Sequence, residues 1–252
     1  MGRYNTSMIT VILNCYKRPE YLKEQLDAVN NQTVGPREVW LWVNDAEENQ
    51  FEGMFENYKF DRVFRSSVNC KYHARFAAGL LAQTEYIAFF DDDTIPGKRW
   101  FENCLNCIDD KPGIYGGAGV IMTSRDYTYH ERVGWPSNNE EIKQVDLVGH
   151  AWFLKRKDLN YLWSEVPMSF DNCEDLQLSY LAQKHGNVNT YCPPHPAGDT
   201  ELHSSLNPWV YGNDSKASSN GSLMPFEVFY GERNRCIKLA LDDGWQTVNR
   251  IA

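Results

Sequence analysis

The sequence of 252 residues lacks several motifs by which large classes of protein are recognised. It contains neither Gly-x-Gly-x-x-Gly nor Gly-x-x-x-x-Gly-Lys-Ser/Thr, which argues against a dinucleotide site and against a P-loop. No apolar run reaches the about 20 residues that span a bilayer, and the N-terminus has no signal-peptide pattern. It also has no internal repeat, low-complexity tract or evident linker. We therefore expect one globular domain, residues 1–252.

Positive charge is also scarce. The chain has 25 Lys and Arg against 34 Asp and Glu, a formal net charge of −9 and a pI near 5.2. This argues against a general binder of nucleic acid or of membrane surfaces, whose footprint is basic. The seven cysteines are odd in number and scattered, which predicts reduced thiols in a cytoplasmic protein. Cys104 and Cys107 have no second pair at zinc-site spacing, so we expect them to pack in the core.

The first hundred residues alternate between short apolar runs and helical patterns. This alternation predicts a Rossmann-like, doubly wound and mainly parallel sheet with right-handed crossovers, the α/β class. The expected strands are residues 8–13, 38–43, 61–64 and 87–90, and the expected helices are 21–30, 51–58, 73–83 and 98–107.

The second half of the chain is less regular. Its expected strands are residues 113–122, 144–154 and 187–192, its expected helices are 157–163 and 174–184, and a loop or hairpin is expected at 123–139. Pro, Gly, Ser and Asn then cluster up to residue 222 and precede a helix at 228–242. This pattern predicts an irregular C-terminal extension.

Three consecutive carboxylates, Asp91, Asp92 and Asp93, follow the apolar run 87–90. Like charges this close repel, and a bound divalent cation is the usual compensation. An Asp-rich turn can also be a solvated loop, but this one ends a buried strand, where open α/β sheets bind ligands. Strand alternation places Asp91 and Asp93 on one side and Asp92 on the other. We therefore expect substitution of Asp92 to be tolerated better than that of Asp93.

Polar side chains follow the other early strands as well. They are Asn14 to Arg18, Asn44 with Asp45, and Asn69 with Lys71 and Arg75. Each group alone is typical of an ordinary turn, but parallel strands bring them to one edge of the sheet. Amides and carboxylates there suit a base and ribose, and the cations suit phosphate. Without a glycine-rich cradle, a metal on the Asp triplet would offset the charge of a diphosphate.

The ordered set of motifs resembles a GT-A fold glycosyltransferase. The match is to family 2 enzymes, with similarity to the exostosin C-terminal domain. It rests on residues 11–19 (Val-Ile-Leu-Asn-Cys-Tyr-Lys-Arg-Pro), 90–93 (Phe-Asp-Asp-Asp, the DxD motif), 149–153 (Gly-His-Ala-Trp-Phe) and 173–176 (Cys-Glu-Asp-Leu, the ED motif). The resemblance covers residues 8–195. It implies a nucleotide-sugar half at 8–110, an acceptor half at 111–195 and an extension at 196–252.

The resemblance also implies a role for individual residues. Mn²⁺ or Mg²⁺ would be held by Asp93 and Asp91, with His195 ahead of His203 as a further ligand. Asp175 would be the general base that deprotonates the acceptor. The donor-binding residues would be Asn14, Tyr16, Arg18, Asp45, Asn69, Arg75, Asp91 and Asp92. The acceptor-side residues would be His150, Trp152 and Glu174.

Simpler explanations stay open for four of these positions. Glu174 and Asp175 are also the carboxylates that a helix dipole favours at an N-terminus. Trp152 could stack on a sugar ring or pack in the core, because one face of its strand must be core. A histidine in a Pro-rich loop, such as His195, is commonly a surface residue.

The expected function is metal-dependent transfer of a sugar from a nucleotide-diphosphate sugar to an acceptor hydroxyl. A UDP-sugar is the favoured donor. The acceptor would be a glycan or another hydroxyl-bearing molecule, with a modified nucleic-acid base not excluded. A positioned base favours inversion at the anomeric carbon, and the exostosin similarity keeps retention open. The alternatives are a sugar nucleotidyltransferase, which normally has a Gly-rich basic loop after its first strand, and a non-catalytic nucleotide- or carbohydrate-binding module.

Overall fold

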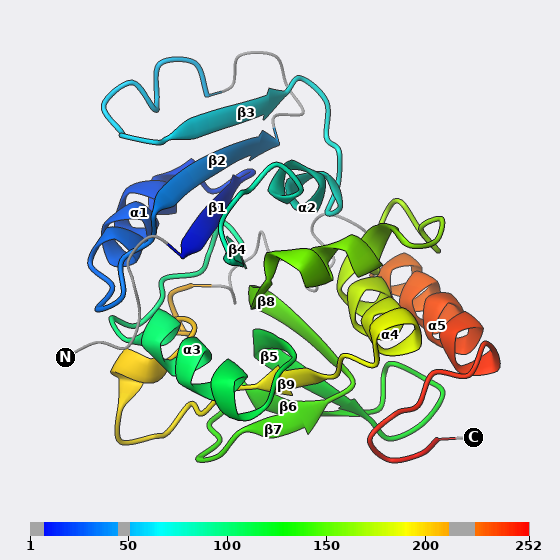
Figure 1. Cartoon of the computed structure of the whole chain (residues 1–252). Coiled ribbons are helices and arrows are strands. Elements are labelled where there is room, and N and C mark those ends of the chain that lie inside the picture. The colour runs from blue at the N-terminus through cyan, green and yellow to red at the C-terminus, as the bar shows by residue number, and fades with distance from the viewer. Residues whose placement is uncertain (1–7, 45–50, 212–224, 252) are drawn as a thin grey trace.

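A nine-stranded mixed sheet forms the centre of the computed structural model, which describes residues 8–44, 51–211 and 225–251. Its first four strands are parallel and lie in the order β3-β2-β1-β4, as predicted from the alternating pattern (Figure 1). Their bounds are β1 Ile9–Cys15, β2 Glu38–Asn44, β3 Arg62–Ser66 and β4 Tyr86–Phe90. The side chains of β4 are all buried, which fits the central position of this strand.

The second half of the sheet adds antiparallel strands beside β4. β8 (Leu147–Lys155) pairs antiparallel with both β4 and β5 (Ile114–Met122). β9 (Thr190–Cys192) runs parallel to β5, and β6 (His130–Gly134) and β7 (Lys143–Val145) complete this side. The antiparallel step at β8 turns residues 149 and 150 toward the carboxyl end of β4.

Helices cover both faces of the sheet. On one face, α1 (Leu22–Asn30) and α3 (Trp100–Asp110) pack on β1 and β4. The helical spacing of Leu22, Leu26 and Val29 puts all three against the core, as the amphipathic pattern predicts. The short 3₁₀ turn Pro19–Tyr21 leads into α1.

The opposite face is covered by α2, a 3₁₀ helix and α4. α2 spans Ala74–Gly79, the 3₁₀ helix η2 spans Arg156–Trp163, and α4 spans Glu174–Gly186. α5 (Phe226–Asp242) lies against the outer side of α4, away from the sheet (Figure 1). A third 3₁₀ segment, Thr200–Leu202, contacts the start of α3. The partition into donor half, acceptor half and extension stays a prediction.

Some of the expected elements differ from the structure. The helix expected at 51–58 is a series of turns, because Gly53 adopts a φ of 74° that a helix cannot contain. The helix expected at 73–83 is limited to α2. For residues 123–139, where a loop or hairpin was expected, the structure has the hairpin, because β6 pairs antiparallel with β5. The strand expected at 144–154 is divided at Asp146, whose buried carboxylate accepts hydrogen bonds from two backbone N–H groups, those of Met122 and Val248.

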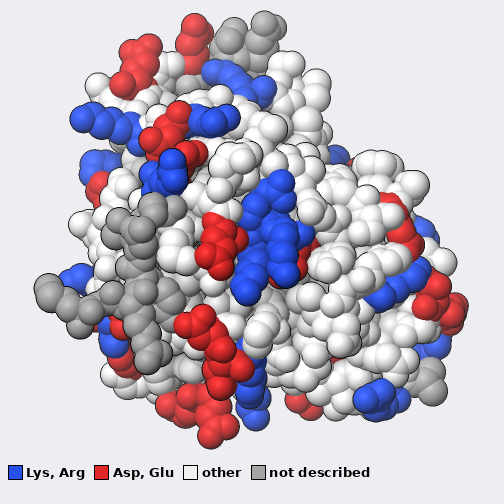
Figure 2. Space-filling model, in the orientation of Figure 1, with Lys and Arg blue, Asp and Glu red and all other residues white. Residues whose placement is uncertain are grey.

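The charged side chains on the face seen in Figure 1 are mixed in sign. Figure 2 shows Lys and Arg interspersed with Asp and Glu, with broad uncharged areas between them. None of the helices in the described part of the chain has the length and apolar character needed to cross a bilayer. All seven cysteines are present as thiols.

Candidate functional site

A cleft of about 300 Å³ lies where the carboxyl ends of β1, β2 and β4 meet β8 and the start of α4. α2, β5, β6 and α5 contribute the rest of its walls. Twelve of the predicted site residues line this cleft: Asn14, Tyr16, Arg18, Asn69, Arg75, Asp91, Asp92, Asp93, His150, Trp152, Glu174 and Asp175. His195 lies elsewhere, and Asp45 is outside the described residues.

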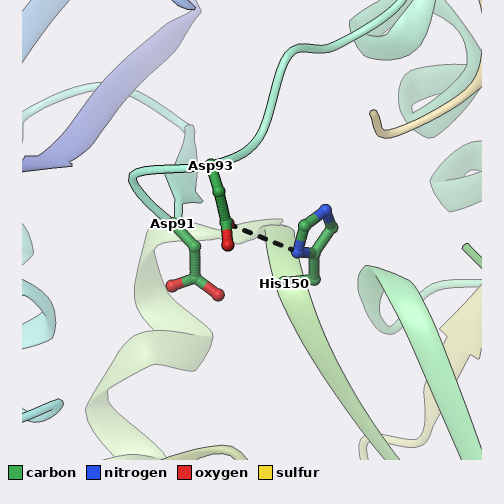
Figure 3. A group of neighbouring side chains, drawn as sticks. All are labelled: Asp91, Asp93 and His150. Carbon is green, nitrogen blue, oxygen red and sulfur yellow. Dashed lines mark ion pairs between the residues drawn. The ribbon is translucent and has the colours of Figure 1, made fainter. Parts of the chain in front are cut away.

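Asp91, Asp93 and His150 form the centre of the cleft (Figure 3). Each offers one ligand atom, and these atoms all lie within 4.8 Å of one another. The Asp93 side chain points toward the His150 ring, with Asp93 Oδ1 3.8 Å from His150 Nδ1. Two carboxylates and an imidazole can hold a divalent cation, and the imidazole suits Mn²⁺ better than the harder Mg²⁺.

His150 reaches this centre through a β-bulge. The pairing of β5 with β8 passes from Gly116 opposite Trp152 to Ala118 opposite Gly149, so β8 carries one extra residue. His150 has a φ of 71°, the left-handed region that a residue with a side chain rarely adopts. Such bulges re-aim side chains next to functional sites. Regular strand alternation would place His150 on the same face as Trp152, and the bulge interrupts that alternation.

The environment of His150 favours the neutral imidazole. Burial lowers its pKa, although the nearby Asp93 and Asp91 carboxylates act in the opposite direction. Trp135 stacks on the ring at a centroid distance of 3.9 Å and an angle of 12°, which fixes its plane. The backbone is also tied to β4, because the Asp91 N–H donates to the His150 carbonyl over 3.3 Å. A neutral, fixed imidazole has the lone pair that a metal ion requires.

Arg75 connects the end of β4 with the start of α4. The residue is 4% exposed, and Nη1 donates to Asp91 Oδ1 over 2.5 Å. Nη2 lies 3.6 Å from Glu174 Oε1, and the guanidinium lies 5.0 Å from the centre of the Trp152 ring. Burial, and then the charge of neighbouring Asp175, raises the pKa of Glu174 to about 8. Arg75 therefore offsets carboxylates from two elements that are distant in sequence.

Arg18 has the same role on the other side of the triplet. Its Nη1 lies 2.8 Å from Asp92 Oδ1 and 3.2 Å from Asp93 Oδ2. The backbone N–H of Tyr16 donates to the second oxygen of Asp92 over 3.2 Å. Burial, together with the charge of Asp93, raises the pKa of Asp92 to about 8. Asp92 thus faces the loop after β1, and its burial argues against the expectation that this position tolerates substitution.

The predicted donor-side polar groups form one hydrogen-bonded network. Asn69 Nδ2 donates to the Tyr16 hydroxyl over 2.9 Å, and Asn44 Nδ2 donates to Asn69 Oδ1 over 2.8 Å. Asn44 also accepts from the Cys70 N–H over 2.8 Å. Asn14 lines the same part of the cleft. The ends of β1 and β2 are therefore joined to the loop before α2.

The first residues of α4 carry the other predicted carboxylates. Glu174 is buried beneath Arg75, while Asp175 lines the cleft and is held by Arg233 from α5. Arg233 Nη2 donates to Asp175 Oδ2 over 2.8 Å, and Nη1 donates to Asp175 Oδ1 over 3.1 Å. The preceding residue, Cys173, has a φ of 70°, which orients the start of the helix. Asp175 is thus fixed by a bidentate pair in addition to its position at a helix N-terminus.

Two predicted residues occupy interior positions. His195 was expected as a metal ligand, but it is fully buried and lies outside the Asp91, Asp93 and His150 group. The Pro193 carbonyl lies 2.9 Å from its Nδ1 and Ser204 Oγ 3.0 Å from its Nε2. Trp152 is 2% exposed and packs edge-on against Phe76, so it belongs to the floor of the cleft.

Several cleft residues carry no signal in the sequence that would have identified them. They come from the 123–139 segment, from the loops before α2 and α4, and from α5: Tyr72, Tyr127, Arg132, Trp135, Asn172, Phe229 and Arg233. The polar and aromatic residues of 123–139 predict a loop or hairpin near the site, but they do not single out any of these side chains. For Arg233, which is 58 positions from Asp175, the helical pattern gave only a helix.

Comparison with known proteins agrees with this architecture. The sequence model described as "Glycosyl transferase family 2" matches residues 10–163, more than half of the chain. Sequence comparison with curated proteins found no match.

Solved structures similar to this chain include two glycosyltransferases. The structure of GalNAc-T7 with UDP, GalNAc and Mn²⁺ has a TM-score of 0.59 at 14% identity, over 75% of this chain and 42% of that one. The structure of S. aureus TarS 1–349 has a TM-score of 0.52 at 16% identity, over 75% and 61%. TarS 1–349 in complex with UDP has a TM-score of 0.52 at 15% identity, over 73% and 60%.

This similarity confirms the predicted GT-A fold. At these identities it concerns the fold alone. The chain spans less than two thirds of the length of each of these structures.

The buried imidazole of His195 predicts a pH dependence of stability. Burial lowers its pKa from 6.5 to about 3, so the folded protein holds the neutral ring while the unfolded chain takes up a proton. The stabilisation is complete above pH 6.5 and is lost as the pH falls toward 3. As the pH falls through this range, we expect the unfolding free energy of the wild type to decrease more steeply than that of His195→Gln, by up to about 1 kcal/mol per pH unit.

Urea unfolding at a series of pH values from about 7 to about 5 tests this expectation. The quantity to compare is the difference in unfolding free energy between wild type and His195→Gln, because the other titrating groups are common to both. The exposed His185, substituted in the same way, serves as the control. A difference that does not vary with pH would contradict the prediction.

Proposed function

Because the chain belongs to glycosyl transferase family 2, we propose that it transfers a sugar from a nucleotide-diphosphate sugar to an acceptor hydroxyl. The proposal rests on one observation: the same cleft contains a group of side chains that could bind a metal ion and, apart from it, a carboxylate held in a fixed orientation. Asp91, Asp93 and His150 form the first, and Asp175 is the second. The hydrogen-bonded groups at the ends of β1 and β2 supply a polar surface for the nucleoside.

A divalent cation is part of the proposal. When bound, it would stabilise the negative charge that develops on the leaving diphosphate. Asp91 and Asp93 would hold it from β4 and His150 from β8, because their ligand atoms already converge. Two similar structures, GalNAc-T7 with UDP and Mn²⁺ and TarS with UDP, support a UDP-sugar as donor and Mn²⁺ as metal.

The proposed chemistry is a single displacement. The acceptor oxygen bonds to the anomeric carbon as the bond from that carbon to the diphosphate breaks, and the electron pair of that bond leaves with the nucleoside diphosphate. Asp175 takes the acceptor proton as general base. Arg75 holds Asp91 in place by their 2.5 Å contact while the donor binds. This displacement inverts the configuration at the anomeric carbon. The configuration of the product, determined by NMR, distinguishes inversion from retention.

A donor screen tests the function itself. We expect incubation with a panel of nucleotide sugars and Mn²⁺ to release a nucleoside diphosphate, with UDP-sugars as the best donors. Release of pyrophosphate would point to a nucleotidyltransferase, and an absence of turnover with every donor would point to a binding module. Either result would refute the proposal.

Substitution of Asp93 tests the metal. Asp93→Asn removes one of two carboxylate ligands, so we expect at least about 100-fold weaker Mn²⁺ binding and loss of metal-dependent donor binding. Titration calorimetry with Mn²⁺, and then with the donor, measures both. The exposed Asp27 on α1, changed to Asn, should bind as the wild type does. An unchanged Mn²⁺ affinity of Asp93→Asn would sink the metal assignment.

Substitution of Asp175 tests the base. Asp175→Asn keeps the shape of the side chain but cannot accept the proton, so we expect kcat to fall about 100-fold to 10,000-fold while donor affinity is preserved. Steady-state kinetics and donor calorimetry separate the two effects. The exposed Asp242 at the end of α5 is the matched control. Transfer at the wild-type rate would remove Asp175 from the mechanism.

A further inference from the structure

A buried arginine on α5, Arg233, contacts Asp175, the proposed general base. Arg233 is 4% exposed, and its two terminal nitrogens contact the two oxygens of Asp175 at 2.8 and 3.1 Å. We propose that Arg233 is a positioning residue that orients Asp175 so that its Oδ2 receives the acceptor proton. This inference rests on the proposed function and adds to it a residue outside the segment, 10–163, that matches the family.

The hydrogen bonds of Asp175 distinguish its two oxygens. Oδ1 accepts from the Leu176 N–H over 2.7 Å and from Arg233 Nη1 over 3.1 Å, which occupies both of its lone-pair directions. Among the described residues, Oδ2 accepts one hydrogen bond, from Arg233 Nη2. One lone pair of Oδ2 therefore remains for a proton, and Oδ2 is the atom that can act as the base.

The position of Oδ2 agrees with this assignment. A methyl group built on Gly149 would meet Asp175 Oδ2 at 3.9 Å, so the oxygen faces the part of β8 that precedes His150. Oδ2 thus lies next to the residue that directly precedes His150, one of the three residues of the proposed metal site. A base-assisted transfer requires the proton acceptor to lie within hydrogen-bond reach of the acceptor hydroxyl.

Arg233 is itself held from three directions. Its guanidinium lies 4.2 Å from the centre of the Tyr127 ring and 5.8 Å from that of Phe229. Its Nη1 also donates to Asn172 Oδ1 over 3.2 Å, in the loop that leads to α4. The guanidinium is planar, and these contacts fix its plane. The orientation of Asp175 is therefore determined by α5, by the segment before β6 and by the segment before α4.

A purely structural role makes a different prediction. A buried ion pair is weak evidence for stability, since its desolvation cost can exceed its attraction. If Arg233 only supported the fold, its loss would lower activity whatever residue stood at 175. If it acts through the carboxylate of Asp175, its loss has no further effect once that carboxylate is removed.

The experiment is a double-mutant cycle on the full chain. Arg233→Met should lower kcat about 100-fold, the usual consequence of a misplaced reacting group, with KM for donor and acceptor changed less than about 3-fold. Arg233→Lys, which keeps the charge but not the two parallel contacts, should recover part of that loss. In the Asp175→Asn background, Arg233→Met should cause no further fall in kcat.

Arg235→Met is the matched control, because this exposed arginine on the same helix pairs with Glu232 and does not line the cleft. We expect its kcat to equal that of the wild type. Thermal melting establishes that each variant is folded. If Arg233→Met does not fold, the same cycle is run with Arg233→Lys, which preserves the buried positive charge.

The outcomes separate the inference from the proposed function. A wild type that transfers no sugar refutes the function and the inference with it, and an Asp175→Asn variant as active as the wild type refutes the base. With both of those established, additive losses in the cycle overturn the positioning role. An effect of Arg233→Met confined to the KM of the acceptor also overturns it, because Arg233 would then bind the acceptor directly.

Discussion

The repulsion among the carboxylates around one cleft is the constraint on which the rest of the site depends. Asp92 and Glu174 are buried, and burial beside other carboxylates raises the pKa of each to about 8. Two buried arginines, Arg18 and Arg75, offset part of this cost from the loop after β1 and from α2. A divalent cation on Asp91 and its neighbours, as proposed, would supply the remaining positive charge. The same acidic groups that destabilise the unliganded site would thus give it affinity for its metal.

The backbone beside these carboxylates is strained at His150. His150 takes a left-handed conformation at a bulge, a conformation that costs free energy for a residue with a side chain. The cost is compensated locally, because Trp135 stacks on the ring and the N–H of Asp91 binds the His150 carbonyl. The bulge places the imidazole beside Asp93, with Nδ1 3.8 Å from Asp93 Oδ1. Strain and ligand geometry therefore have one origin, the extra residue in β8.

The parts of this arrangement that were predictable depend on neighbouring residues in the sequence. The apolar run before Asp91 indicated a buried strand, and the carboxylates after it indicated a site at the strand end. The same local logic identified the polar ends of β1 and β2 and the carboxylates at the start of α4. With the resemblance to known enzymes, it also gave the fold class.

The parts that were not predictable depend on pairings between distant segments. The bulge at His150 follows from the register of β8 on β5, which no local pattern encodes. His195 follows a strand in a Pro-rich loop, a context that suits a surface residue or a metal ligand equally well. Its position is decided by packing against Trp100, which is distant in the sequence, and by a contact with Ser204, nine positions further along the chain.

The proposed base also depends on a segment that is distant in the sequence, because Asp175 is held by Arg233 from α5. The family match ends at residue 163, so it includes Asp91, Asp93 and His150 but not Asp175 or α5. Asp175 at a helix N-terminus would have its carboxylate stabilised by the dipole without any partner. The dipole does not fix the plane of the carboxylate, whereas a bidentate guanidinium does, because it occupies a defined direction on each oxygen. The Leu176 N–H then distinguishes the two oxygens, because it binds Oδ1. If Asp175 is the base, then the geometry of proton transfer is set by the segment that the sequence pattern described least.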